Sequence, residues 1–120
     1  MGPNDYPCGH RSPDLKAIRG LHAEARKRVL SKLSKGLAHP ARVEIVRMLL
    51  NKPPEERCVC GDIVKALPLA QSSVSQHLKV LKETGWVFGD NDGQYVRYCL
   101  VDGITKYYVA LIEQSFQDEV

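Results

Sequence analysis

The chain has 120 residues, of which 43% are hydrophobic, and this is enough for one small globular domain. It contains no run of about 18 apolar residues that could span a membrane. The polar N-terminus lacks the apolar stretch of a secretory signal. We therefore expect a cytoplasmic protein whose four cysteines are free thiols or metal ligands rather than disulfides.

The formal net charge of +3 is unevenly distributed along the chain. Residues 1–60 carry 12 Lys and Arg against 6 Asp and Glu, whereas residues 61–120 carry 5 against 8. A basic half can attract phosphate groups, but a basic helix face can equally serve only to keep a helix hydrated. Charge alone therefore leaves nucleic-acid binding open.

The N-terminal part predicts a polar arm over residues 1–11, followed by a single domain over residues 12–120. Ser12-Pro13-Asp14 is a typical helix start, with a hydroxyl N-cap, a proline at the first helical position and an acid in the first turn. Apolar residues then recur three or four positions apart. We expect one long helix that ends near Gly36 and that Gly20 can kink.

Three further helices are predicted in the middle of the chain. A helix should open at Pro40 and run to about residue 50, because Pro53-Pro54 then requires an extended link. A short helix is predicted over residues 61–68. A second helix, capped by Ser72, should run to residue 84 and end at Gly85.

The C-terminal part predicts a hairpin and a last helix. Residues 86–88 and 94–101 have the composition of strands, and residues 89–93 between them are rich in turn-forming Gly, Asp and Asn. Asp102 should cap a final amphipathic helix.

This order of elements predicts a mostly α fold with a small β-hairpin wing, which is a winged helix-turn-helix. The first and last helices have large apolar faces and little left to contact. We therefore expect a homodimer formed through these two helices, whose two-fold symmetry matches the half-sites of a palindromic operator in double-stranded DNA.

The predicted helix over residues 72–84 has an apolar and a polar side. Val74, Leu78 and Leu81 share one side with His77, for which packing at the core edge is the favoured interpretation. The polar side places short or amide side chains near the N-terminal end, which in this motif enters the major groove, where Gln can pair with adenine. The expected DNA-binding residues are Gln71, Ser72, Ser73, Ser75 and Gln76, with Lys79 and Arg97 contacting phosphate.

The segment LAQSSVSQHLKVLKETGWV, followed by GQYVRYCL, resembles the ArsR/SmtB family of metal-responsive repressors. GLAHPARVEIVRMLL is similar to the second helix of that family, and RCVCGDIV to the start of its metal-binding helix. The resemblance implies a homodimer that binds operator DNA when free of inducer and dissociates when loaded. The hairpin tip of the family is basic, whereas Asp90 and Asp92 stand here, so Arg97 is the better candidate for a wing contact.

Cys58-Val59-Cys60 precedes the predicted helix-turn-helix. In an α-helix, residues two positions apart point about 200° away from each other, whereas in extended backbone they point the same way. The pair lies between the prolines and the next helix, where the backbone can be extended. The two sulfurs can therefore chelate a soft ion.

Two sulfurs do not complete such a site, because arsenite and antimonite prefer three and zinc prefers four ligands. In one branch of the family a third cysteine stands where this chain has Ile63; in another, the N-terminal arm supplies ligands. The second pattern implies that Cys8 joins Cys58 and Cys60 to bind arsenite, antimonite or lead. Adding His10 would suit zinc or cadmium. Arsenite and antimonite are the favoured inducers.

The sequence thus predicts a repressor of a metal or metalloid resistance operon, with no membrane partner and no organic substrate. The alternative is a repressor of the same fold that senses thiol oxidation or persulfide through Cys58, Cys60 or Cys99 without a metal. Cys99 itself is expected in the core of the wing. A purely structural or protein-binding winged helix is another possibility. An enzyme is not expected, because no CxxC precedes a βαβ pattern and no Cys-His-Asp constellation is present.

Overall fold

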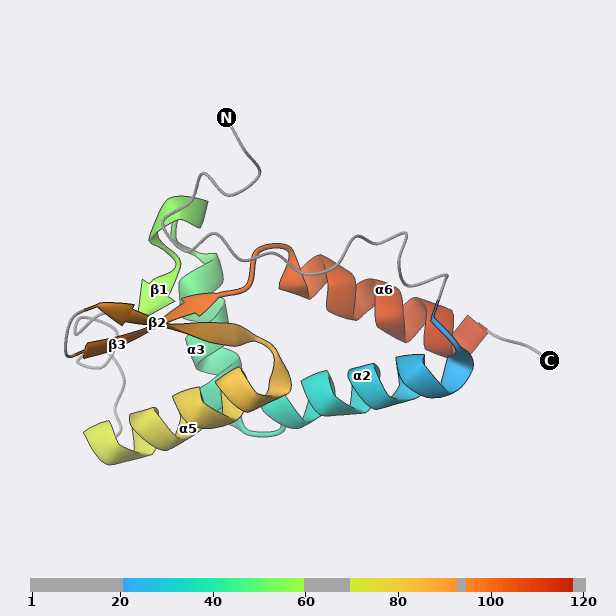
Figure 1. The fold of residues 1–120 in the computed structure, drawn as a ribbon, viewed down its shortest axis with the longest axis horizontal. Helices are drawn as coiled ribbons and strands as arrows, with labels where there is room; N and C mark the ends of the chain where they lie inside the picture. The colour runs from blue at the N-terminus through green and yellow to red at the C-terminus, as the bar shows by residue number, and fades with distance from the viewer. Residues whose placement is uncertain (1–20, 60–69, 93–94, 118–120) are drawn as a thin grey trace.

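The computed structural model of the protein describes residues 21–59, 70–92 and 95–117. A small sheet lies at one end of the molecule, and the helices over residues 23–36 and 104–117 extend side by side toward the other end (Figure 1). In chain order the elements are α2 (Ala23–Gly36), α3 (Pro40–Leu50), the 3-10 turn η1 (Pro54–Glu56), β1 (Cys58–Val59), α5 (Gln71–Thr84), β2 (Val87–Asp92), β3 (Tyr95–Leu100) and α6 (Ile104–Gln117). The predicted mostly α fold with a β-hairpin wing is confirmed.

The sheet is antiparallel and has the strand order β1-β3-β2. Its third strand, β1, was not predicted as a strand, although the extended backbone expected at Cys58 is confirmed. The hairpin is longer than predicted, because β2 continues through the expected turn and Asp92 still lies opposite Tyr95. Cross-strand pairing over residues 89–92 therefore overrides the turn preference of Gly, Asp and Asn.

The first helix differs from its prediction. It begins at Ala23, and His22 before it has extended backbone with φ −63° and ψ 153°. The predicted continuous helix is therefore wrong at residues 21–22, and its expected start at residues 12–20 lies outside the described part, as does the arm over residues 1–11. Gly20 costs a helix about 1 kcal/mol relative to alanine, which favours a break at this place.

The other helix ends follow local capping chemistry. The predicted start of α3 at Pro40 is confirmed, and Nδ1 of His39 accepts a hydrogen bond from the Ala41 amide at 3.0 Å. Helix α5 ends as predicted at Gly85, which has a φ of +100°. Its predicted N-cap, Ser72, is wrong, because the helical hydrogen bonds begin at the carbonyl of Ala70.

The last helix begins at Ile104 rather than directly after Asp102, since Gly103 with a φ of +76° lies between them. The short helix predicted over residues 61–68 lies outside the described residues. No helix in the described ranges has both the length and the apolar character that crossing a bilayer requires.

The core is centred on Trp86, whose side chain is 1% exposed. Its indole Nε1 donates a hydrogen bond to the carbonyl of Leu33 in α2 at 2.7 Å. Its ring packs edge-on against Tyr108 of α6, with 5.1 Å between ring centroids. The Tyr108 hydroxyl in turn is 2.8 Å from Oγ of Ser34. Helices α2 and α6 therefore contact each other within one chain, and the expectation that they have little left to contact is wrong.

Gly36, at the end of α2, allows this close approach. A Cβ atom placed there would lie 2.5 Å from Cδ1 and 2.7 Å from Nε1 of Trp86, and it would also clash with Oγ1 of Thr84. Neither neighbour can move easily, because both side chains are buried. A small residue at this position is therefore a packing requirement.

We expect Gly36→Ala to lower the free energy of unfolding by about 1–3 kcal/mol, because the added methyl group overpacks the contact with Trp86. Urea denaturation followed by tryptophan fluorescence measures this change. Lys32→Ala, at an exposed position of the same helix, is the control and should change stability by no more than about 0.5 kcal/mol. Equal stability of Gly36→Ala and the native protein would contradict the packing requirement.

Candidate functional site

Helix α5 has the two sides that its sequence predicts. Val74, Leu78 and Leu81 are 1%, 4% and 0% exposed, so they attach the helix to the core. The predicted DNA-binding residues lie on the other side: Ser72, Ser75, Gln76 and Lys79 are exposed and Ser73 is half-buried. The side chain of Gln71 lies outside the described part. The helix thus presents a polar ridge to solvent at the end of the molecule that also carries the sheet (Figure 1).

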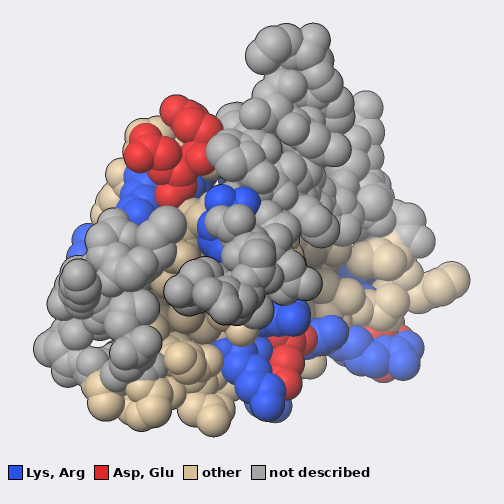
Figure 2. Space-filling model, turned by 60° about the vertical axis from the view of Figure 1, so that its left-hand side comes forward, with Lys and Arg blue, Asp and Glu red and all other residues tan. Residues whose placement is uncertain are grey.

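Basic side chains gather near this ridge. Figure 2 shows Lys and Arg along the lower part of the face that carries the sheet, at the height of α5 and α2, with fewer Asp and Glu among them, whereas the largest acidic group lies at the upper edge beside further Lys and Arg. On α5 itself, Lys79 and Lys82 are exposed. Such side chains are the kind that attract an anionic backbone.

Arg97, the predicted wing contact, lies on β3 opposite Asp90 of β2 and is half-buried. Its backbone therefore belongs to the wing as predicted. Its partial burial distinguishes it from the exposed residues of α5. A contact between Arg97 and phosphate stays a prediction.

A polar cluster that the sequence did not predict joins α5 to the segment between α2 and α3. The guanidinium of Arg42 donates from Nε to the carbonyl of Gly36 at 2.9 Å and from Nη2 to that of Lys35 at 3.2 Å. Its Nη1 lies 3.2 Å from Nδ1 of His77, and the rings of His39 and His77 have centroids 4.4 Å apart. The packing of His77 at the core edge is confirmed.

The surroundings of His77 lower the pKa of its imidazole below the usual value of 6.5. Partial burial is the largest cause, followed by the positive charges of His39 and Arg42. A neutral His77 can accept the hydrogen bond from Arg42 at Nδ1, whereas a protonated ring cannot. The signal in the sequence is the segment His39-Pro40-Ala41-Arg42, which places an N-cap and a guanidinium one helical turn apart.

Two of the cysteines form a contact that the sequence did not predict. Cys58 on β1 and Cys99 on β3 lie directly opposite each other in the sheet and form a disulfide. They are 5% and 0% exposed, so the predicted burial of Cys99 is confirmed. The expectation that the cysteines do not form disulfides is therefore wrong for these two, whereas metal binding by reduced Cys58 stays a prediction. The two cysteines are 41 residues apart in sequence, so their contact could not be predicted without the pairing of β1 with β3.

The other predicted ligands, Cys60, Cys8 and His10, lie outside the described residues. Within the described ranges, no group of three or more His, Cys, Asp and Glu side chains is arranged to hold a metal ion. What the structure does describe is the segment that carries Cys58. Arg57 closes the end of α3 by donating to the carbonyls of Leu50 and Lys52 at 3.1 and 3.0 Å, and its own carbonyl accepts from the Leu100 amide at 2.8 Å.

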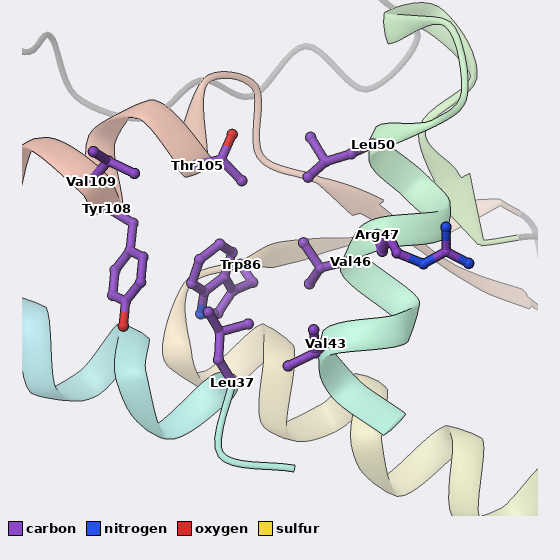
Figure 3. A pocket seen from close by; sticks show the side chains of 9 residues that line it. All are labelled: Leu37, Val43, Val46, Arg47, Leu50, Trp86, Thr105, Tyr108 and Val109. Carbon is purple, nitrogen blue, oxygen red and sulfur yellow. The ribbon is translucent and has the colours of Figure 1, made fainter. Parts of the chain in front are cut away.

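A hollow of about 230 Å³ lies between α3 and α6, with Trp86 at its floor (Figure 3). Its walls are almost entirely apolar. Val43 of α3 and Val109 of α6 stand at its rim and are 45% and 53% exposed. The lining residues are Leu37, Val43, Val46, Arg47, Leu50, Trp86, Thr105, Tyr108 and Val109. This set has no thiol or imidazole, so the hollow is an apolar surface rather than a place for a soft ion.

Comparison with known proteins adds a consistent family signal. Residues 39–87 match the family described as bacterial regulatory protein, arsR family. The transcriptional regulator CmtR of Mycobacterium tuberculosis is 37% identical over 82 residues, which span 68% of this chain and 66% of that protein. The arsenical resistance operon repressor of Escherichia coli is 34% identical over 87 residues, which span 72% of each protein.

A solved structure agrees with these sequence matches. HlyU from Vibrio cholerae superimposes with a TM-score of 0.54 at 29% identity, covering 79% of this chain and 96% of the other. The likeness confirms the predicted winged helix-turn-helix fold. The matched relatives are transcriptional regulators and not enzymes.

The depressed pKa of His77 predicts a pH-dependent stability. Below pH 6.5 the unfolded chain protonates this histidine before the folded protein does, so the free energy of unfolding should fall as the pH falls through 6.5 toward the folded pKa. Urea denaturation across this pH window, with His77→Asn as the variant that removes the effect, measures it.

His39→Asn keeps a capping side chain but removes one positive neighbour. It should raise the pKa of His77, as followed by NMR titration, and still leave it below 6.5 because burial is the larger cause. A pKa of His77 at or above 6.5 in the native protein would show that the interpretation of this cluster is incorrect.

Proposed function

Because the chain belongs to the arsR family of bacterial regulatory proteins, we propose that it is a cytoplasmic transcriptional repressor that binds operator DNA and is released by a thiophilic ion. The observation that carries the DNA-binding part is the polar ridge of α5, whose opposite side is buried in the core. A rigid helix with exposed Ser and Gln near its N-terminal end is suited to the major groove.

In this proposal the N-terminal half of α5 reads bases and the charged side chains position the protein. Gln71, Ser72, Ser73, Ser75 and Gln76 are the base-reading candidates. Lys79 and Arg97 contact phosphate without reading sequence. The basic side chains level with α5 (Figure 2) support the orientation in which this face meets the duplex.

The operator is proposed to be palindromic because the protein is proposed to act as a homodimer. Val109 and Phe116 of α6 are 53% and 78% exposed, and Val109 also lines the apolar hollow beside Val43 (Figure 3). Covering such side chains by a second copy removes apolar area from water. The dimer would still use α6, although α2 and α6 already contact each other within one chain.

The inducer is proposed to bind Cys58, Cys60 and Cys8, with arsenite or antimonite favoured and cadmium, lead or zinc as alternatives. His10 would join for cadmium or zinc. The extended backbone at Cys58–Val59 supports chelation, because chelation by residues 58 and 60 requires an extended rather than a helical segment. The name of the Escherichia coli relative, an arsenical resistance operon repressor, supports a metalloid.

A second candidate function is a repressor of the same family that senses oxidation without a metal. The disulfide between Cys58 and Cys99 is the specific observation that favours it. In this case peroxide alone would release the protein from DNA, whereas the metal proposal requires an ion.

For DNA binding, we expect Gln76→Ala to cost about 1–3 kcal/mol of specific affinity and to relax preference at one base position, whereas Lys79→Ala should weaken binding to all sequences and lower its salt dependence. Fluorescence anisotropy on a palindromic duplex selected by the protein from random DNA measures both. Lys106→Ala on α6 removes the same charge at an exposed position away from α5 and should bind normally. Loss of affinity in this control, in a variant that keeps the oligomeric state of the native protein, would move the interface away from α5.

For the inducer, Cys58→Ser, Cys60→Ser and Cys8→Ser should each remain on DNA at ion concentrations that release the native protein, because each removes one sulfur from the site. The assay is anisotropy under reducing conditions with arsenite, antimonite, cadmium, lead and zinc in turn. Cys99→Ser is the matched control and should still be released. Normal release of the Cys58 variant would place the sensing site elsewhere.

A further inference from the structure

Cys58 takes part in two kinds of chemistry that exclude each other. In the proposed inducer site its sulfur binds an ion, whereas in the structure its sulfur is bonded to that of Cys99. A disulfide sulfur has no thiolate left to offer a soft cation. We propose that the Cys58–Cys99 disulfide is a redox gate on the inducer site, so that the oxidised repressor no longer responds to the ion. This inference rests on the proposed function.

The sheet holds the two sulfurs in position to react. Cys58 and Cys99 are partners in the β1–β3 register. The carbonyl of Arg57, next to Cys58, accepts a hydrogen bond from the amide of Leu100, next to Cys99. Opposed residues of an antiparallel pair are neighbours whether or not their sulfurs are bonded. Opening or closing the disulfide therefore needs no change in strand pairing.

The gate leaves the DNA-binding helix in place. In the disulfide form, α5 is helical from Gln71 to Thr84 and its apolar residues Val74, Leu78 and Leu81 are buried. Arg42 is hydrogen-bonded to His77. The polar ridge of α5 is therefore exposed to solvent while the disulfide is present. We therefore expect the oxidised protein to stay on the operator even when the ion is present, because the ion cannot bind to bias the equilibrium.

Closing the gate requires a two-electron oxidant, and hydrogen peroxide is sufficient. The sulfur of Cys58, which is the slightly more exposed residue of the two, attacks one peroxide oxygen. The O–O bond breaks, and a sulfenic acid and one water molecule form. The Cys99 sulfur then attacks the Cys58 sulfur, the S–O bond breaks, and the disulfide and a second water molecule form. The two thiol protons leave in the water, both sulfurs are oxidised, and the peroxide is reduced.

Thermodynamic linkage makes the effect reciprocal. If the disulfide prevents ion binding, then a bound ion must equally oppose disulfide formation, because both compete for the same sulfur. Cys99 is the partner that closes the gate and is not itself a ligand of the ion. A variant without Cys99 should therefore bind the ion when reduced but never form the cross-strand bond.

The test uses the full chain, reduced under anaerobic conditions, with cadmium as the probe. The ultraviolet absorbance of cadmium–thiolate bonds reports binding, peptide mapping by mass spectrometry identifies the disulfide, and anisotropy reports operator binding. When stoichiometric peroxide is added before cadmium, the native protein should yield the Cys58–Cys99 disulfide peptide and show no cadmium–thiolate absorbance. It should stay on DNA when cadmium is then added. Reduction with dithiothreitol should restore cadmium binding. Protein loaded with cadmium beforehand should form the disulfide more slowly.

Cys99→Ala is the matched variant, with Cys99→Ser as a second choice and thermal denaturation as the check that each folds. When reduced, either variant should give the same cadmium absorbance as the native protein. Loss of cadmium binding by a folded variant would make Cys99 a ligand and overturn the gate.

Three further outcomes separate the possible failures. Equal cadmium binding by the reduced protein and by protein with a mapped Cys58–Cys99 disulfide would overturn the gate alone. Release of the oxidised protein from DNA without any ion would overturn it in favour of direct oxidation sensing. Failure of the reduced native protein to bind any of the candidate ions would contradict the proposed function itself, and the gate with it.

Discussion

The buried hydrogen bond from the indole of Trp86 to the carbonyl of Leu33 is the contact on which the arrangement of the other elements depends. Trp86 lies between the end of α5 and the start of β2, so this one side chain attaches α5 and the wing to α2. Its ring also packs against Tyr108 of α6. An indole N–H buried without a partner costs about 1–3 kcal/mol, so the donor, the acceptor and the space left by Gly36 must occur together.

A second tie holds the other side of α5. Arg42 bridges the carbonyls at the end of α2 to His77 in the middle of α5. The hydrogen bonds of Arg42 and the buried apolar residues of α5 together fix the direction in which the polar ridge faces. The segment that carries Cys58 reaches α5 by a different route, through β3 and then β2, which directly follows the helix. Cys58 is therefore connected to α5 through the paired strands of the wing.

Much of the fold was predictable because local rules act strongly in this chain. Pro40 and Gly85 set helix ends by backbone geometry, and the three-to-four spacing of Val74, Leu78 and Leu81 identified the buried side of α5. Predictions failed where pairing or packing between distant segments overrides local preference. Because β2 pairs with β3, it remains a strand through a glycine- and aspartate-rich stretch. Because α2 and α6 contact each other, part of the apolar surface that was assigned to a dimer interface is buried within one chain.

The sequence by itself determined the family resemblance, the polar ridge of α5 and the choice of Cys58 as a candidate ligand, since each depends on residues close together in the chain. Only the tertiary structure decided that Cys58 faces Cys99, and that Arg42 meets His77. Both pairs are far apart in sequence, and one helix or strand cannot indicate which other element it will contact. For the cysteines, the register of β1 on β3 supplied that information, because strand pairing places two buried cysteines opposite each other and thereby makes a predicted core cysteine the partner of a predicted ligand.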